Sequence, residues 1–193
     1  MADQFRGCAQ NYFERLRQVL DGIDHSEIEE FVNLLLHARE FSKKIFFVGN
    51  GGSAATSSHF ANDLSIGTRQ KEKPFRVISL VDNVATLSAI GNDFGYDQIF
   101  ARQIEVYGQA GDLLVGISAS GNSPNLIRAF EAGREIGLKT VSVTAFDGGK
   151  LKQISDHSVH VPTQVGEYGP AEDAHLILDH LITHYFQTVL DAA

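Results

Sequence analysis

Histidines and carboxylates with the spacing of metal ligands occur at two places in the sequence. His59 and Asp63 are four residues apart in a predicted helix, so they share one face and could hold one divalent cation. A second group follows near the end of the chain: Glu172, His175, Asp179 and His180. Mixed nitrogen and oxygen donors suit Zn²⁺, and Fe²⁺, Mn²⁺ or Ni²⁺ would also fit. The same spacing equally fits histidines packed on the core and side-chain pairing along a helix, so both interpretations stay open at this point.

The second group spans too much of a helix to surround one cation by itself. Glu172 and His180 are eight residues apart, which corresponds to about 12 Å along a helix axis. If both serve one site, either Glu172 precedes the helix or a neighbouring subunit supplies one of the two. We therefore expect a homo-oligomer.

Two loops rich in glycine and hydroxyl groups could bind an anion. Residues 49–53 (GNGGS) follow a short apolar run, and residues 118–123 (SASGNS) follow another and lead into a helix that begins at Pro124. Glycine lets the backbone approach a ligand, and serine hydroxyls and helix N-terminal N–H groups bind phosphate. Turn formation and capping would explain either loop alone, but two such loops in one sheet favour phosphate binding. Neither has the P-loop or dinucleotide-binding spacing, which disfavours a nucleotide.

Short apolar segments that alternate with helical ones must position these groups. The predicted strands are residues 44–48, 75–80, 112–117, 140–144 and 157–161. Helices are predicted over residues 3–38, with a break at 24–26, and over 54–64, 124–136 and 172–190. This alternation is typical of an α/β three-layer sandwich, in which helices cover both faces of a parallel sheet and ligands bind at the carboxyl ends of its strands.

Composition disfavours several classes of function. With 193 residues the chain suits a single domain, residues 1–193, and its net charge of −8 without a strong cluster of Lys or Arg disfavours a nucleic-acid surface. No apolar run approaches the ~20 residues of a membrane span. The single cysteine, Cys8, cannot form an internal disulfide, and no secretory leader is recognisable. We expect a cytoplasmic protein with no membrane and no nucleic acid as partner.

Six motifs in order give the sequence a resemblance to a known family. They are residues 49–53, 59–61, 91–95, 116–123, 147–149 and 175–180. Together they resemble the phosphoheptose isomerase branch of the SIS superfamily, over about residues 5–189. The resemblance implies an SIS-type (flavodoxin-like) fold with a five-stranded parallel sheet, and N-terminal helices, residues 1–40, used in oligomerisation. It also implies a homotetramer with sites at subunit interfaces and a divalent metal, usually zinc. The implied reaction is the aldose–ketose isomerisation of sedoheptulose 7-phosphate to D-glycero-D-manno-heptose 7-phosphate.

The resemblance also assigns roles to individual positions. Those matched to substrate or phosphate binding are Asn50, Gly51, Ser53, Asp93, Ser118, Ala119, Ser120 and Ser123. Those matched to metal binding are His59, Asp63, Glu172 and His180. Of these four, Asp63, Glu172 and His180 are also matched to catalysis.

Two of these positions depart from the family pattern. Asp63 stands where the family has a Glu that serves as base and ligand, and Glu172 stands where it has a Gln ligand. One hypothesis is that Asp63 binds the metal while Glu172 removes the proton next to the carbonyl. The departures leave open an isomerase of a different sugar phosphate. The other alternative is a non-catalytic SIS adaptor that binds a replication-initiator protein; the ionisable groups at all four ligand positions favour the enzyme.

Overall fold

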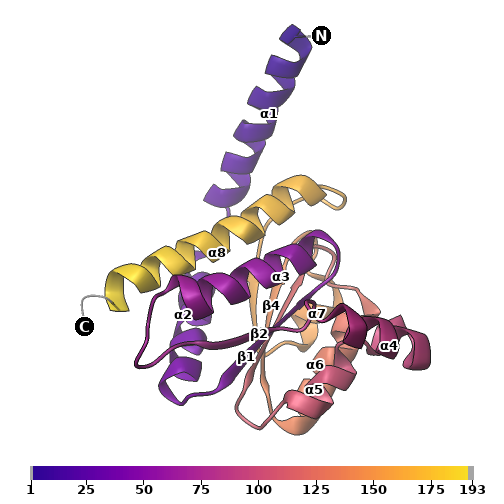
Figure 1. Ribbon diagram of the computed structural model, residues 1–193. Coiled ribbons are helices and arrows are strands. Elements are labelled where there is room, and N and C mark those ends of the chain that lie inside the picture. The colour runs from indigo at the N-terminus through magenta and orange to yellow at the C-terminus, as the bar shows by residue number, and fades with distance from the viewer. Residues whose placement is uncertain (1, 191–193) are drawn as a thin grey trace.

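The computed structural model describes residues 2–190 and contains a five-stranded parallel β-sheet (Figure 1). Its strands are β1 (Lys44–Gly49), β2 (Arg76–Ser79), β3 (Leu113–Ser118), β4 (Lys139–Thr144) and β5 (His157–His160). They pair in the order β2-β1-β3-β4-β5, all parallel, which is the flavodoxin-like order. The expected sheet is confirmed, and each predicted strand end lies within one residue of its observed place.

Helices cover both faces of the sheet, because alternate side chains of a strand point to opposite faces. Ile45 and Phe47 of β1 pack in one hydrophobic core, and Phe46 and Val48 pack in a second. The helices of the first core are α2 (His25–Glu40), α3 (Gly52–Asn62) and α8 (Tyr168–Leu190). Those of the second are α5 (Ala101–Tyr107), α6 (Pro124–Ile136) and α7 (Gly149–Ile154), with α4 (Val84–Phe94) and the short 3₁₀ helix η2 (Tyr96–Gln98) beside them. The three-layer α/β sandwich is confirmed.

The N-terminal helix α1 (Ala2–Asp21) projects from this sandwich (Figure 1). It is separated from α2 by a cap, in which the Asp24 carboxylate accepts a hydrogen bond of 2.8 Å from the Ser26 N–H. This cap explains the break predicted between the two N-terminal helices. The side chains of Phe5 and Phe13 on α1 are exposed.

Two polar contacts attach α1 to the start of α8. The Tyr12 hydroxyl donates a hydrogen bond of 2.6 Å to the Asp173 carboxylate, which raises the pKa of Tyr12 to about 12. The Arg15 guanidinium pairs with Glu167 through two hydrogen bonds of 2.8 and 2.6 Å and lowers the pKa of that carboxyl to about 2. The projecting helix therefore holds the segment that leads into α8.

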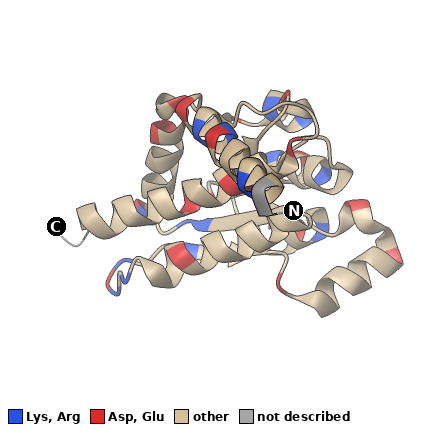
Figure 2. Ribbon diagram, turned by 90° about the horizontal axis from the view of Figure 1, so that it is seen from above, with Lys and Arg blue, Asp and Glu red and all other residues tan. Residues whose placement is uncertain are grey.

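Charged residues are mixed along the helices in the view of Figure 2, where Lys and Arg lie among Asp and Glu. Within residues 2–190, none of the helices is both long and apolar enough to cross a bilayer.

Helices α3 and α8 lie side by side and run in the same direction (Figure 1). They meet at three levels: the Glu172 carboxylate lies beside Gly52, His180 faces His59, and the Gln187 amide donates a hydrogen bond of 2.9 Å to the Gly67 carbonyl. Between the second and third levels α3 continues as a π-helical segment, η1 (Asp63–Gly67), in which the Thr68 N–H donates to the Asp63 carbonyl at 3.0 Å. Such π segments are frequent at functional sites.

Candidate active site

The two loops predicted to bind an anion follow neighbouring strands, β1 and β3. These strands flank the point where the strand order reverses, which is where open parallel sheets bind their ligands. The first loop turns at Gly51, whose φ of 54° disfavours a side chain, and leads into α3. The second loop ends at Ser123, and Pro124 then begins α6. The N-terminal N–H groups of both helices are thus available at the edge of one cavity.

That cavity, called here the serine cradle, is lined by Asn50, Ser53, Ile117, Ser118, Ala119, Ser120, Ser123, Tyr168 and Glu172. It brings together six of the eight residues matched to substrate binding. Gly51 lies exposed in the turn next to it. Asp93 lies on exposed α4, where the Asn92 amide donates to it at 2.8 Å, and it does not line the cradle.

An amide network joins the two loops behind the cradle. The side chains of Asn50 and Asn125 exchange hydrogen bonds of 2.9 and 2.8 Å, and the Tyr96 hydroxyl donates to the Asn50 side-chain oxygen at 3.0 Å. Asn125 is 1% exposed, so its amide needs these partners. The sequence analysis missed Asn125 and Tyr96, because an asparagine in the first turn of a helix and a tyrosine after a glycine have no distinctive pattern.

The motif at residues 147–149 packs against the second loop, residues 118–123. Gly121 has a φ of 62°, and a Cβ added there would lie 2.7 Å from the Gly148 carbonyl carbon. The Lys150 N–H donates to the Asn122 side-chain oxygen at 3.0 Å, and the Leu151 N–H donates to the Gly121 carbonyl at 2.9 Å. The loops after β3 and β4 can approach this closely only where glycine is present.

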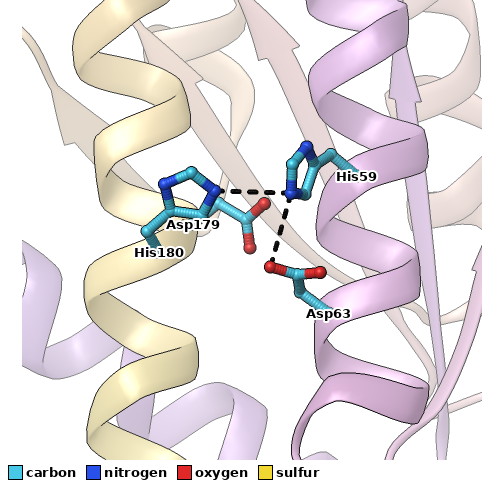
Figure 3. A group of neighbouring side chains, drawn as sticks. All are labelled: His59, Asp63, Asp179 and His180. Carbon is cyan, nitrogen blue, oxygen red and sulfur yellow. Dashed lines mark hydrogen bonds and ion pairs between the residues drawn. The ribbon is translucent and has the colours of Figure 1, made fainter.

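A second group of side chains, the histidine–carboxylate cluster, lies farther along α3 and α8 (Figure 3). It comprises His59, Asp63, Asp179 and His180, and one donor atom of each lies within 4.8 Å of all the others. His59 Nε2 is 3.3 Å from His180 Nε2 and 3.4 Å from Asp63 Oδ2. Three of the four predicted metal ligands are therefore brought together, and the fourth member is Asp179.

Asp179 is the buried member of the cluster, with 0% of its surface exposed. Its Oδ1 accepts a hydrogen bond of 3.4 Å from Thr183, while its Oδ2 has no hydrogen-bond partner among the described residues. Burial, and then the nearby Asp63 carboxylate, raise the pKa of Asp179 to about 7. The side chain of His59 is 43% exposed, so the cluster opens to solvent on the α3 side.

His175 lies on the inner side of α8 and is 1% exposed. Burial lowers its pKa to about 4, and the backbone of Thr144 offsets only part of this effect. Within residues 2–190 neither ring nitrogen has a hydrogen-bond partner of good geometry. We interpret His175 as a neutral core residue.

Glu172 lies outside the cluster. It lines the serine cradle, and its carboxyl carbon would lie 2.7 Å from a Cβ added to Gly52 at the start of α3. In the helix α8 it precedes His180 by eight residues, or about 12 Å of axis. Within one chain Glu172 and His180 therefore occupy neighbouring but separate parts of the site, as their spacing indicated.

Comparison with known proteins places this arrangement in a family. The SIS domain family matches residues 11–145. Phosphoheptose isomerase from Helicobacter pylori (strain P12) is 37% identical over 169 residues, which cover 88% of this chain and 86% of that protein. The chain belongs to the SIS-domain phosphoheptose isomerase family. Phosphoheptose isomerase from Clostridium acetobutylicum is 38% identical over 84% of this SIS chain and 82% of its own length.

Solved structures agree with this assignment. The structure of phosphoheptose isomerase from Neisseria gonorrhoeae matches this SIS domain with a TM-score of 0.86 and 30% identity, over 97% of this chain and 100% of the other. As a member of this family the chain is an enzyme, an aldose–ketose isomerase that acts on a sugar phosphate.

Proposed function

We propose that this enzyme converts sedoheptulose 7-phosphate into D-glycero-D-manno-heptose 7-phosphate, with the help of a bound Zn²⁺ ion. The observation that supports this most directly is the placement of the serine cradle and the histidine–carboxylate cluster along one pair of helices, α3 and α8. The cradle suits the phosphate end of a sugar, and the cluster suits its carbonyl end. The relatives named phosphoheptose isomerase support the choice of a seven-carbon sugar.

Phosphate binding is the role of the cradle. The hydroxyls of Ser53, Ser118, Ser120 and Ser123 and the first N–H groups of α3 and α6 can donate hydrogen bonds to phosphate oxygens. Asn50 holds the two loops at a fixed distance. Binding this remote group contributes free energy that aligns the reacting carbons. We keep three further residues as proposed substrate-binding residues: Gly51, Ala119 and Asp93. Asp93 lies on α4, outside the cradle.

The reaction moves two protons and needs no oxidant. A base removes a proton from C1 of the ketose and returns it to C2, while the hydroxyl proton moves from O1 to O2. We assign the transfer between the oxygens to His180 and the base to Glu172 supplied by a neighbouring subunit, because within one chain Glu172 lies at the cradle, about 12 Å of helix from His180. Asp63, the third residue matched to catalysis, acts as a metal ligand.

The cluster fits a divalent cation. It combines two imidazole nitrogens with carboxylate oxygens, a donor set that suits Zn²⁺. His59, Asp63 and His180 would hold the ion, which when bound polarises the carbonyl and stabilises the enediolate. The buried, unpartnered Oδ2 of Asp179 is further support, because an uncompensated carboxylate is costly to bury.

We further propose a cytoplasmic homotetramer of single-domain chains, assembled through residues 1–40. The exposed side chains of Phe5 and Phe13 on projecting α1 support this assembly, since exposed aromatic groups on one helix are typical of an interface. Light scattering after gel filtration would test it. A tetramer that persists in a Phe5→Ser/Phe13→Ser variant would contradict this role of α1.

A panel of ketose phosphates with five to eight carbons tests the function. The zinc-loaded protein is incubated with each sugar, and formation of the aldose is measured. The highest kcat/KM for the seven-carbon sugar would support the proposal. A higher kcat/KM for another sugar would show that the proposed substrate is wrong, while the isomerase reaction stands. Turnover of none would favour the adaptor interpretation.

Exchange of the C1 proton with solvent tests the assignment of the base. Glu172→Gln should abolish the exchange while Zn²⁺ stays bound, because the amide cannot accept the proton. Asp63→Asn should weaken Zn²⁺ binding. Normal exchange in Glu172→Gln would show that another group is the base.

A further inference from the structure

Asp179 is a buried carboxylate that no Lys or Arg of residues 2–190 pairs with. Its side chain extends from α8 toward the two histidines and Asp63 (Figure 3). In the described part of the chain, neither Asp63 nor Asp179 pairs with a Lys or Arg side chain; Asp63 pairs with His59. Asp63 is partly exposed and accepts a hydrogen bond of 2.9 Å from the Asn62 amide, but Asp179 is fully buried, and a buried carboxylate next to a second carboxylate is unfavourable without a cation. This arrangement calls for a positive charge between them.

The donor separations also match a small tetrahedral ion. Zn²⁺ binds nitrogen and oxygen donors at about 2.0 to 2.1 Å, so neighbouring donors around it lie about 3.3 to 3.4 Å apart. His59 Nε2 is 3.3 Å from His180 Nε2 and 3.4 Å from Asp63 Oδ2. Two edges of such a tetrahedron are therefore present, and Asp179 supplies a donor within 4.8 Å of the other three.

Glu172, unlike Asp179, lies at the serine cradle and not at the cluster. Its carboxylate lies beside Gly52 at the start of α3, whereas the histidine of the cluster on that helix, His59, follows seven residues later. Seven residues correspond to about 10 Å of helix. Glu172 cannot reach the cluster of its own chain without a rearrangement of α8.

We propose that Asp179 is the fourth protein ligand of the cation, which is thus bound within one chain, and that Glu172 is not a ligand. This inference rests on the proposed metal-assisted function. It adds a residue that the family resemblance did not indicate, and it explains how Glu172 is free to act as a base at the sugar.

Zinc affinity of the metal-stripped full chain tests the inference. Competition with a chromophoric chelator gives Kd for the wild type, Asp179→Asn, Glu172→Ala and Glu135→Gln. Glu135 is exposed on α6 and serves as a control for loss of one negative charge. We expect Asp179→Asn to raise Kd at least tenfold, and the other two variants to stay within about twofold of wild type. A normal Kd in Asp179→Asn, or a raised Kd in Glu172→Ala, overturns the inference.

A ligand exchange gives a positive signal that does not depend on activity. Asp179→Cys loaded with Co²⁺ should show the near-ultraviolet band of a thiolate–cobalt bond, and cysteine is well tolerated in buried positions. Glu172→Cys should show none, and the wild type, which contains exposed Cys8, gives the background. A band in Glu172→Cys with none in Asp179→Cys overturns the inference.

Thermal unfolding separates a ligand from a purely structural residue. Without metal, Asp179→Asn should unfold no earlier than the wild type, since it removes a buried charge that lacks a partner. Zn²⁺ should then raise the Tm of the wild type more than that of the variant. A metal-free variant that is less stable than the wild type would show a structural role. If the wild type isomerises the sugar while Asp179→Asn binds zinc normally, only this inference fails and the proposed function stands.

Discussion

Replacing Gly52 with alanine should slow the enzyme without unfolding it. Gly52 opens α3, and its backbone is compatible with any residue. A Cβ there would lie 2.7 Å from the Glu172 carboxyl carbon and closer still to its Oε2, so the carboxylate must withdraw by about 1 Å to reach the 3.4 Å of ordinary contact. The substitution thus moves the proposed base without removing it.

The expected magnitudes follow from this displacement. Misplacement of a catalytic group by about 1 Å can cost about 100-fold, so kcat should fall by about 10- to 100-fold. The free energy of unfolding should not fall. The displaced atoms are the flexible end of a side chain, and alanine is favoured over glycine in helices by up to about 1 kcal/mol.

Steady-state kinetics and thermal unfolding of a small set of variants provide the assay. Gly7 on α1 is the matched control, because among the described residues nothing lies within 4 Å of a Cβ added there; Gly7→Ala should keep wild-type kcat. If Gly52→Ala acts through Glu172, adding it to Glu172→Gln should slow that variant no further. Wild-type kcat in Gly52→Ala, or additive losses in the double variant, would refute the reasoning.

Three further outcomes are expected. Ser120→Ala should raise KM for the sugar phosphate about 10- to 100-fold, because a hydrogen bond to a charged group contributes about 1.5 to 3 kcal/mol; an unchanged KM would mean that the phosphate binds elsewhere. Gly121→Ala should reduce the free energy of unfolding by at least about 2 kcal/mol in urea titration, because its φ of 62° is strained for alanine and the backbone of Gly148 blocks the Cβ. His175 has a pKa of about 4 in the folded chain against an ordinary value of 6.5, so the unfolded chain binds more protons between these values and stability falls as pH drops through this window. His175→Leu should flatten this pH dependence relative to the wild type.

The fold could be predicted from local patterns. The central strands β1 and β3 are buried on both faces and therefore form continuous apolar runs, which are easy to recognise. The serine cradle could also be predicted, because loops after neighbouring parallel strands must meet at the same edge of the sheet. Each strand and each loop is recognised from residues close together in sequence, and the parallel sheet then brings the two loops together.

The composition of the cluster could not be predicted in this way. Glu172, His175 and Asp179 recur at helical spacing, and the sequence does not show which side of α8 faces α3. That orientation is decided by contacts between distant segments, such as His59 with His180 and Gly67 with Gln187. Asp179 and His175 are both buried, and only the side chains beside each of them distinguish Asp179, a cluster member, from His175, a core residue.

The parallel pairing of α3 and α8 has a consequence for the choice of sugar. Gly52 and His59 are separated by about 10 Å of helix, and a helix packed on a core does not stretch. A sugar phosphate that reaches from the serine cradle near Gly52 to the cluster at His59 must therefore have a chain of matching length, whatever the configuration of its hydroxyl groups. Shorter ketose phosphates would occupy the phosphate end and act as competitive inhibitors, because their carbonyl would stop short of the histidines.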